Sequence, residues 1–331
     1  MATITPGASV AVTGSFNTSP AASGVFIPSI WSGKLNAKFY ATTVFGEIAN
    51  TNYEGDIKNI GDKVIINNIP SISINNYTIG QTLNYQVPTP SKIELNITQA
   101  KYFGVNISDV LEYQSQPKLM DMFTNDAAKQ MAINIDADVL FGNYGSGAAA
   151  NKGSTAGVIS GSFNLGTDAA PVVLSPTNVV NVITGLASVL DEQNVPDTDR
   201  WVVITPYMRN ILMQSPLAQA YVTGDSASIL RNGKIGTIDR FTIYVSNLLP
   251  TGAAGFQVAS ATGTNSGVTQ GGALKRTAII AGHKTGITFA SQIAKVESLQ
   301  NPNDFGTLVR GLNVYGYNTI KPEALALALV Q

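Results

Sequence analysis

The sequence predicts an α+β fold, in which separate groups of strands and helices share one chain. Apolar and polar residues alternate with a period of two between residues 64 and 97 and again after residue 277, as in half-buried strands. Apolar residues recur at helical spacing between residues 117 and 141 and between residues 176 and 190. A fully apolar run at residues 201–204 leads into a helix-starting proline, which is typical of a sheet covered by helices.

The chain begins with 33 residues that carry no charge and are rich in Ala, Ser, Thr, Gly and Pro. We expect them to form an arm that is extended until it docks on another surface. A helix is predicted over residues 34–48, with Phe39 and Phe45 on its apolar side.

The segment between Lys63 and Lys92 has no charged side chain and alternates as strands do. Folded back on itself, it forms a hairpin with arms of roughly 45 Å at ~3.3 Å per residue, about twice the radius of gyration of a compact body of this length. An uncharged strand edge pairs readily with another chain, so we expect the hairpin to contact a neighbouring copy of the protein. The residues predicted to make this contact are Ile72, Ile74, Tyr77, Ile79, Leu83, Tyr85 and Val87.

A long helix is predicted from Pro117 to Phe141, with the proline in its first turn and Gly142 closing it. An apolar residue recurs at every fourth position along it, which makes one continuous stripe. At ~1.5 Å per residue the helix is roughly 37 Å long, so we expect it to act as a spine for the elements around it.

Residues 143–174 are rich in Gly, Ala and Ser and form a connection, after which we predict an α/β insert with a central sheet. Pro176 and Pro206 each follow a hydroxyl residue that can cap a helix, and each starts one. Asn232-Gly233 indicates a turn. Strands are predicted at residues 201–204, 241–245, 277–281, 287–299 and 308–319, and at the final alternation of Leu325, Leu327 and Leu329.

The composition favours a protein whose surface is covered by partners. Of the 331 residues, 44% are hydrophobic, which is enough for a large core, but only 12% are charged, about half the usual ~25%. A free monomer normally needs more surface charge to stay dispersed. The net charge of −1 gives no field for reading nucleic acid. No signal peptide or membrane span is apparent, so we expect the chain to stay in a cytoplasm.

Catalytic chemistry finds little support, and we predict no catalytic, cofactor-binding or metal-binding residues. The absence of cysteine removes thiolate catalysis and cysteine metal sites. The single histidine, His283, has no marked partner and is expected to be structural or on the surface. The acidic pairs Asp136/Asp138 and Asp191/Glu192 are one or two residues apart, so they do not face each other on a helix and are expected on solvated faces.

The order of these parts resembles the major capsid protein of tailed bacteriophages, with its Hong Kong-type coat fold. The resemblance covers nearly the whole chain. Its most family-like stretches are residues 199–206 (DRWVVITP), 236–250 (GTIDRFTIYVSNLLP), and 311–317 (GLNVYGY) followed by 321–324 (KPEA). The order and the separation of these stretches are what resemble the family.

The resemblance implies a division of the chain. An N-terminal arm (1–33), an extended loop (50–91) and a peripheral domain (34–49 and 92–142, with the spine helix at 117–141) precede an axial domain (143–276). The last segment (277–331) returns through the axial domain to strands of the peripheral domain.

The function implied is to assemble, as pentamers and hexamers, the icosahedral head that encloses double-stranded DNA. The partners implied are further copies of the chain, a separate scaffolding protein, a cementing protein, a portal at one vertex and packaged DNA in non-specific contact, with no membrane. Assembly is expected in the cytoplasm of a bacterial host. Some relatives join their subunits through a lysine of the extended loop, but residues 64–91 contain none, so no such covalent link is expected here.

Two other functions remain open from the sequence. An encapsulin-like bacterial nanocompartment would have the same fold but hold enzyme cargo. A β-rich adhesin or tail-fibre module would share the Asn, Thr and Gly content, although it predicts short repeats that are not evident.

Overall fold

The computed structural model describes residues 43–52, 63–68, 70, 72–83, 85–108, 119–215, 237–252, 276–302 and 305–331. The chain divides into residues 1–35 and 36–331, and the elements below belong to the second unit. The predicted arm, most of the predicted helix at 34–48 and the Asn232-Gly233 turn lie outside the described residues. Of that helix, the structure describes α1 (Phe45–Ile48).

A six-stranded central sheet occupies the second half of the described chain. Its strands run in the order β11-β8-β4-β6-β5, with the short β7 also paired to β8. All neighbours are antiparallel except β4 and β6, which are parallel. The strands are β4 (Arg200–Ile204), β5 (Thr237–Ile238), β6 (Phe241–Val245), β7 (Thr251–Gly252), β8 (Arg276–His283) and β11 (Leu325–Val330).

Both faces of the central sheet are buried, each by a different hydrophobic core. One core includes helices α5 (Val179–Glu192) and α6 (Pro206–Met213), and the other includes residues of α1 and of α4 (Leu119–Asn143). Strand β11 shows the division, because its alanines face the α5 core and its leucines face the α4 core. The final Leu alternation therefore marks a strand buried on both sides rather than a half-buried one.

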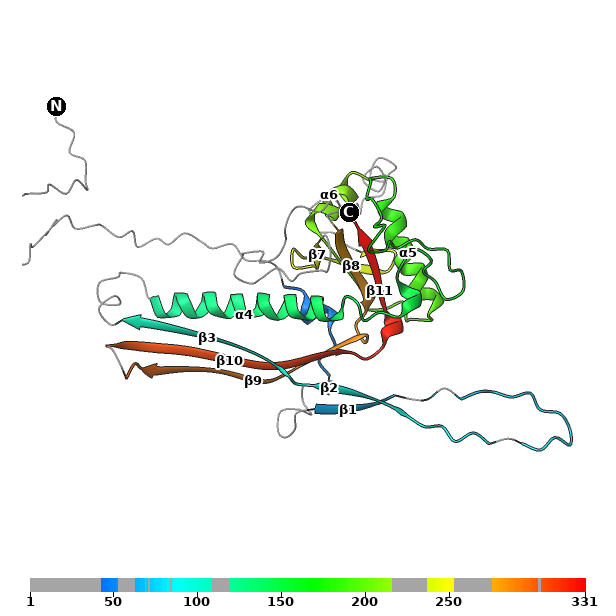
Figure 1. Ribbon diagram of the computed structural model, residues 1–331, viewed down its shortest axis with the longest axis horizontal. Coiled ribbons are helices and arrows are strands. Elements are labelled where there is room, and N and C mark those ends of the chain that lie inside the picture. Colours follow the sequence, from blue (N-terminus) through cyan, green and yellow to red (C-terminus); the bar gives the residue numbers. More distant parts are fainter. Residues whose placement is uncertain are drawn as a thin grey trace, which may run out of the picture. The chain divides into compact units, whose positions relative to one another are not determined.

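A second, three-stranded antiparallel sheet packs against α4 (Figure 1). Its order is β3 (Gln99–Ser108), β10 (Gly306–Thr319) and β9 (Ile287–Gln300). Tyr315 on β10 donates a hydrogen bond of 2.6 Å to Asp138 on α4, and Lys101 on β3 forms an ion pair of 2.9 Å with the same carboxylate. Tyr315 and Lys101 thus mark the sheet face that meets α4.

The spine helix is found as α4, but its end differs from the prediction. Gly142 does not close the helix, which continues through it to Asn143. A β-carbon on Gly142 would overlap the ring of Tyr317, so the glycine is required for close packing rather than for a helix end. Along the apolar stripe, Ile135 and Val139 are buried, whereas Phe123 is 44% exposed.

The helices of the α/β insert agree with their sequence signals to within a few residues. Thr205 caps α6 by accepting a hydrogen bond of 3.3 Å from the backbone N–H of Met208. Pro176 starts a turn, and α5 begins three residues later, at Val179. Asn178, just before the helix, accepts a hydrogen bond from the N–H of Ser175. The short 3₁₀ helices η1 (Ala149–Asn151) and η3 (Pro322–Ala324) lie in the connections.

Candidate assembly surface

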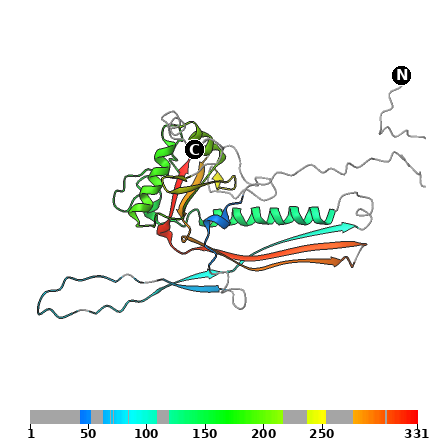
Figure 2. The same cartoon turned by 180° about the vertical axis from the view of Figure 1, so that it is seen from behind.

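The uncharged segment forms a hairpin that is symmetric about the peptide between Ile79 and Gly80. Its paired strands are β1 (Lys63–Asn68) and β2 (Ser91–Asn96), and every pair of the register, from Lys63 with Asn96 inward, is centred on that peptide. Gly80 lies in the turn with φ of +89°, a conformation that favours glycine. Figure 2 follows the two arms from β1 and β2 to this turn.

Beyond β1 and β2 the arms keep this register through side chains rather than through a ladder. Gln86 accepts a hydrogen bond from the N–H of Ser73 at 3.1 Å and donates one to its hydroxyl at 2.6 Å. Gln81 accepts from both the N–H and the hydroxyl of Thr78. Both residue pairs are symmetric about the same turn as the strands.

The prediction that the whole segment forms strands is therefore wrong for the outer part of the hairpin. The described residues between 70 and 90 are not strand residues. Pro70, Pro88 and Pro90 explain the break, because proline cannot donate a backbone hydrogen bond and these three lie just beyond the paired strands.

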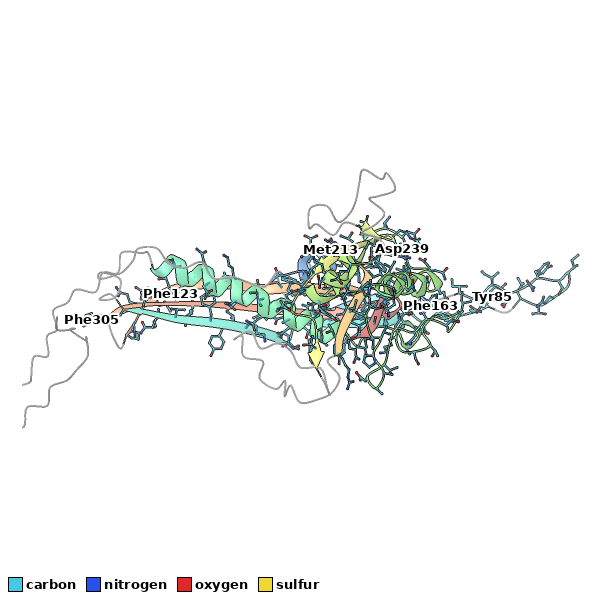
Figure 3. All side chains as sticks on the ribbon, turned by 90° about the horizontal axis from the view of Figure 1, so that it is seen from above. Tyr85, Phe123, Phe163, Met213, Asp239 and Phe305 are labelled. Atoms are coloured by element: carbon cyan, nitrogen blue, oxygen red, sulfur yellow. The ribbon has the colours of Figure 1, made fainter. Side chains whose placement is uncertain are left out.

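All seven residues predicted to contact a neighbour lie on this outer part and are exposed. Figure 3 shows one of them, Tyr85, on the arm that leads to β2. Their exposed fractions are 66% for Ile72, 92% for Ile74, 66% for Tyr77, 98% for Ile79, 56% for Leu83, 83% for Tyr85 and 88% for Val87. The structure thus brings together an apolar, uncharged surface that the described part of its own chain leaves open to solvent.

The root of the hairpin, in contrast, is packed against the three-stranded sheet. Leu95 is fully buried, and Ile97 is buried beside Ala290 of β9. A β-carbon on Gly316 of β10 would overlap the carbonyl of Asn96, which shows how closely the two backbones approach. Asn318 also donates a hydrogen bond of 2.8 Å to the carbonyl of Glu94. The hairpin is therefore anchored at one end and exposed at the other.

Asp136 is not on a solvated helix face, contrary to the sequence prediction. Its side chain is fully buried and accepts hydrogen bonds from the N–H groups of Val44 (3.2 Å) and Phe45 (2.9 Å) at the start of α1. Burial raises the pKa of Asp136 from 3.8 to about 6, against the opposing effect of the two hydrogen bonds. Asp136 thus joins α4 to the segment that leads into the hairpin.

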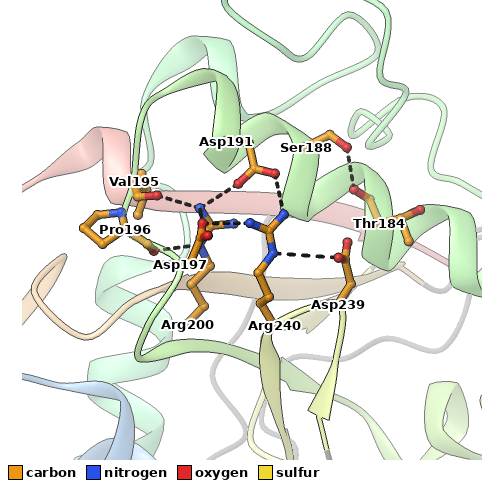
Figure 4. Close-up of polar contacts among 9 residues, drawn as sticks. All are labelled: Thr184, Ser188, Asp191, Val195, Pro196, Asp197, Arg200, Asp239 and Arg240. Carbon is orange, nitrogen blue, oxygen red and sulfur yellow. Dashed lines mark hydrogen bonds and ion pairs between the residues drawn. The ribbon is translucent and has the colours of Figure 1, made fainter.

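The pair Asp191/Glu192 also has structural partners that the sequence does not reveal. Asp191 lies between two guanidinium groups, at 2.7 Å from Arg200 and 2.9 Å from Arg240, and Asp197 bridges the same two arginines (Figure 4). The Arg200 side chain is completely buried. Glu192 accepts hydrogen bonds from the N–H groups of the 159–160 loop.

The turn between β5 and β6 contains Arg240, which forms ion pairs with Asp191 and Asp197. Asp239 and Arg240 both adopt positive φ, at 45° and 68°, as a two-residue type I′ hairpin turn requires. Asp239 tolerates positive φ, but without glycine or asparagine at either position the sequence carries only a weak signal for this turn. The ion pairs of Arg240 with Asp191 and Asp197 hold the turn against α5.

His283 is a buried structural residue. It is 7% exposed and is paired with Arg200 across β4 and β8, and its Nδ1 lies 2.8 Å from the hydroxyl of Thr285. Burial is the main reason that its pKa is lowered. Among the described residues, no group of three or more His, Cys, Asp or Glu side chains could hold a metal ion.

The sequence model of the phage capsid protein family matches residues 92–328. The chain belongs to the phage capsid protein family. This capsid protein is thus a structural protein of the virion, and its family and fold make it a major capsid protein, the subunit of a shell built from many copies. A comparison with curated protein sequences finds no match.

Solved capsid structures share the fold of this capsid protein at low sequence identity. A chain from Mycobacterium phage Che8 is 23% identical, with a TM-score of 0.68 over 92% of this chain and 97% of that one. A capsid chain of cyanophage P-SCSP1u is 16% identical, with a TM-score of 0.67 over 92% and 93%. A capsid chain of the native GTA particle is 13% identical, with a TM-score of 0.56 over 96% and 99%.

The family match decides between the functions that the sequence left open. The matched family is that of phage capsids, so the encapsulin-like compartment and the adhesin are not favoured. Among the helices that the structure describes, none has the length and apolarity to cross a membrane.

Proposed function

We propose that this major capsid protein forms the pentamers and hexamers of an icosahedral head that encloses double-stranded DNA. The observation that carries the proposal is the hairpin, anchored at its root and presenting seven exposed apolar residues without a charge at its outer part. Such a surface is stable in water only when another surface covers it. A neighbouring subunit in the ring is the partner that a shell supplies at every position.

The physical chemistry of a ring suits a contact of this kind. Rings require head-to-tail interfaces, in which two different surfaces of the same protein meet. Burying one large apolar side chain gains about 1.5–3 kcal/mol, and much of this is offset by the loss of free motion on association. Because a closed ring makes all its contacts at once, each can be weak while the assembly is stable.

The division of the chain into functional regions is part of the proposal. The arm (1–33), the extended loop (50–91), the peripheral domain (34–49 and 92–142), the axial domain (143–276) and the returning segment (277–331) would each serve the shell. Support comes from the two larger sheets of the described chain, one packed on α4 and one enclosed between two cores.

The remaining partners follow from the same function. A separate scaffolding protein suits a subunit whose exposed apolar hairpin must not pair wrongly before the shell closes. A cementing protein, a portal at one vertex and non-specific contact with packaged DNA complete the proposed set, with assembly in the cytoplasm of a bacterial host. The net charge of −1 is consistent with DNA contact that is weak and independent of base sequence.

The proposal is tested by removing the outer part of the hairpin. Deleting residues 64–91 would also remove most of β1, whose Val64 and Ile66 pack beside Leu95 at the root. The sharper variant joins Asn68 to Ser91 through an Asn-Gly turn and keeps β1 and β2. We expect the unaltered chain, alone or with a scaffolding protein, to form closed shells in electron microscopy, and the shortened chain to remain folded as small oligomers.

The matched control is Thr82→Ser, which keeps every apolar residue of the hairpin and every side-chain hydrogen bond between its arms. It should assemble as the unaltered chain does. Normal shells from the shortened chain, with an unchanged circular dichroism spectrum, would contradict the proposal.

A further inference from the structure

The described chain passes between its two larger sheets at three places, and the three connections meet. They are the segment after α4 (144–148), the turn between β8 and β9 (283–286) and the connection between β10 and β11 (320–324). The carbonyl of Gly286 accepts a hydrogen bond of 2.9 Å from the N–H of Ile320. The carbonyl of Pro322 accepts another, also of 2.9 Å, from the N–H of Ala148. Backbone hydrogen bonds therefore link the three connections into one structure, which we call the sheet joint.

The turn in this joint begins with His283, the last residue of β8. Its Nδ1 accepts a hydrogen bond of 3.2 Å from the N–H of Thr285 and lies 2.8 Å from the hydroxyl of the same residue. The carbonyl of His283 accepts a further bond of 2.8 Å from the N–H of Gly286. The imidazole thus serves the turn as an Asn or Asp oxygen does when it accepts from the N–H two residues further on.

This geometry requires a neutral imidazole. A ring nitrogen that accepts a hydrogen bond from a backbone N–H carries no proton of its own, so the proton of the neutral ring is on Nε2. A second proton would have to enter at Nδ1, where the N–H of Thr285 already points. The Thr285 hydroxyl can rotate to accept from a protonated Nδ1, but the backbone N–H would lose its partner. Protonation of His283 therefore removes a hydrogen bond from the turn.

The surroundings of His283 also favour the neutral ring. The charged residues of its turn, of β4 with the residues before it, and of the β10–β11 connection are Lys284, Asp197, Asp199, Arg200, Lys321 and Glu323. Burial is the largest reason that the pKa of His283 is lowered, and the cations of Arg200 and Lys321 lower it further. Asp199 and a hydrogen bond with the backbone of Thr198 act on the pKa in the opposite direction. Arg200 shares its own charge with Asp191 of α5.

We propose that a proton on His283 opens the turn between β8 and β9 and loosens the sheet joint, so that acid frees the two larger sheets to change their angle. The closed turn is favoured above about pH 6.5, the ordinary pKa of histidine, and is progressively disfavoured as the pH falls below it. Opening moves the carbonyl of Gly286, which is the acceptor for Ile320. Because the chain has a single histidine, the response belongs to one group. The inference goes beyond the proposed function, since it concerns the folded subunit and not the hairpin.

Amide hydrogen exchange of the full-length chain at about pH 7.5 and about pH 5 tests the inference. Each rate is corrected for the intrinsic pH dependence of exchange, and both samples are kept in one assembly state, verified by sedimentation. We expect the protection of residues 283–286 and 320–324 to fall at least about fivefold at the lower pH. The physical limit is about 30-fold, because a histidine with a pKa of about 6.5 in the open turn favours opening by that factor at pH 5. Peptides from α5 are the internal reference and should change less than about twofold.

The matched variant is His283→Asn, because an asparagine oxygen accepts from the N–H two residues further on in the same way but does not titrate. The protection of its turn should change less than about twofold between the two pH values. Asp136 titrates in the same range in both chains. Acid stabilises the contact of Asp136 with α1, so this carboxyl group cannot produce the expected loss.

Two charge variants repeat the test without altering the ring, should His283→Asn prevent folding. Lys321→Gln removes a cation that lowers the pKa of His283, so it should weaken the response to acid. Asp199→Asn removes the carboxylate that opposes this effect, so it should strengthen the response. Both residues are exposed, and asparagine tolerates the positive φ of 54° at Asp199.

Three results would overturn the inference. The first is an equal response of the unaltered chain and His283→Asn, or full protection of the turn at pH 5. The second is an equal loss of protection in α5, which would indicate general unfolding in acid. The third is a shift in the same direction from Lys321→Gln and Asp199→Asn, which would show that His283 is not the group that titrates. The formation of shells decides the proposed function alone, so the failure of either proposal leaves the other standing.

Discussion

At the scale of single residues, a buried carboxylate decides how the start of the described chain is held. Asp136 and the N–H groups from which it accepts hydrogen bonds are 91 and 92 residues apart in sequence. The sequence contains no local signal for such a contact, because an Asp close to another Asp on a helix suggests a solvated face. The contact depends on the tertiary fold, which places the start of α1 beside Asp136 of α4.

The raised pKa of Asp136 predicts a specific dependence of stability on pH. The folded protein takes up this proton at about pH 6 and the unfolded chain at about 3.8. The extra stability is therefore fully present below the unfolded pKa and is lost as the pH rises through the folded one. Relative to Asp136→Asn, the free energy of unfolding should rise by about 2 kcal/mol as the pH falls from about 6.5 to about 4, because each pH unit between the two pKa values contributes about 1.4 kcal/mol and the change is partial near either pKa.

The measurement is urea unfolding of the hairpin-shortened chain, with and without Asp136→Asn, at closely spaced pH values. Comparing the two variants at each pH cancels the titration of all other carboxylates. A difference that stays constant across this range would show that Asp136 titrates at its ordinary pKa.

The buried guanidinium of Arg200 predicts a large effect of removing its carboxylate partner. Asp191→Asn should lower the free energy of unfolding by about 3 kcal/mol, because it leaves a fully buried cation with the exposed Asp197 as its remaining ion-pair partner among the described residues. Asp239→Asn is the control, since Asp239 lies 3.9 Å from Arg240, whose own side chain is 42% exposed rather than buried. It should cost less than about 0.5 kcal/mol, and equal losses from both variants in thermal unfolding would count against this account.

At the scale of elements, local sequence signals predict the starts of helices, their buried faces and the apolar strand. Helix α6 follows its capping threonine and proline, the buried face of α5 is the one that its periodicity indicates, and β4 is the apolar run of residues 201–204. The hairpin turn also comes close to the centre of the uncharged segment. The sequence does not show which elements pack against each other, so β11 could not be recognised as buried on both sides. The outer part of the hairpin does not form paired strands, although its apolar and polar residues alternate, because its prolines cannot donate backbone hydrogen bonds.

Gly142 makes a testable case of a misread signal. In a helix interior, Gly→Ala normally stabilises by about 1 kcal/mol. Gly142→Ala should instead destabilise the protein by about 1–3 kcal/mol, because the new methyl group overlaps the ring of Tyr317. Gly46→Ala in α1 is the matched control, since no described atom lies near its added β-carbon, and it should be neutral or stabilising. A gain of stability from Gly142→Ala in chemical denaturation would show that the Tyr317 ring moves aside at little cost, so that close packing does not require the glycine.

At the scale of the whole molecule, the hairpin chemistry predicts how finished shells are held together. Residues 64–91 contain no lysine, so the hairpin between Lys63 and Lys92 has no side-chain amine that could link it covalently to another chain. Shells boiled in sodium dodecyl sulfate should therefore run as single chains of 34.8 kDa. A ladder of larger species under reducing conditions would reveal a covalent link elsewhere in the subunit.

The three prolines at the hairpin root have a consequence for how one sequence can serve in more than one ring. Pro70, Pro88 and Pro90 stand where the ladder of β1 and β2 stops, so a change of angle there leaves the hydrogen bonds between the two strands intact. The outer arms stay together through Ser73, Gln86, Thr78 and Gln81. A pivot at the prolines would let the same exposed apolar side chains of the hairpin meet a neighbour at the angle of the proposed fivefold ring or of the proposed sixfold one.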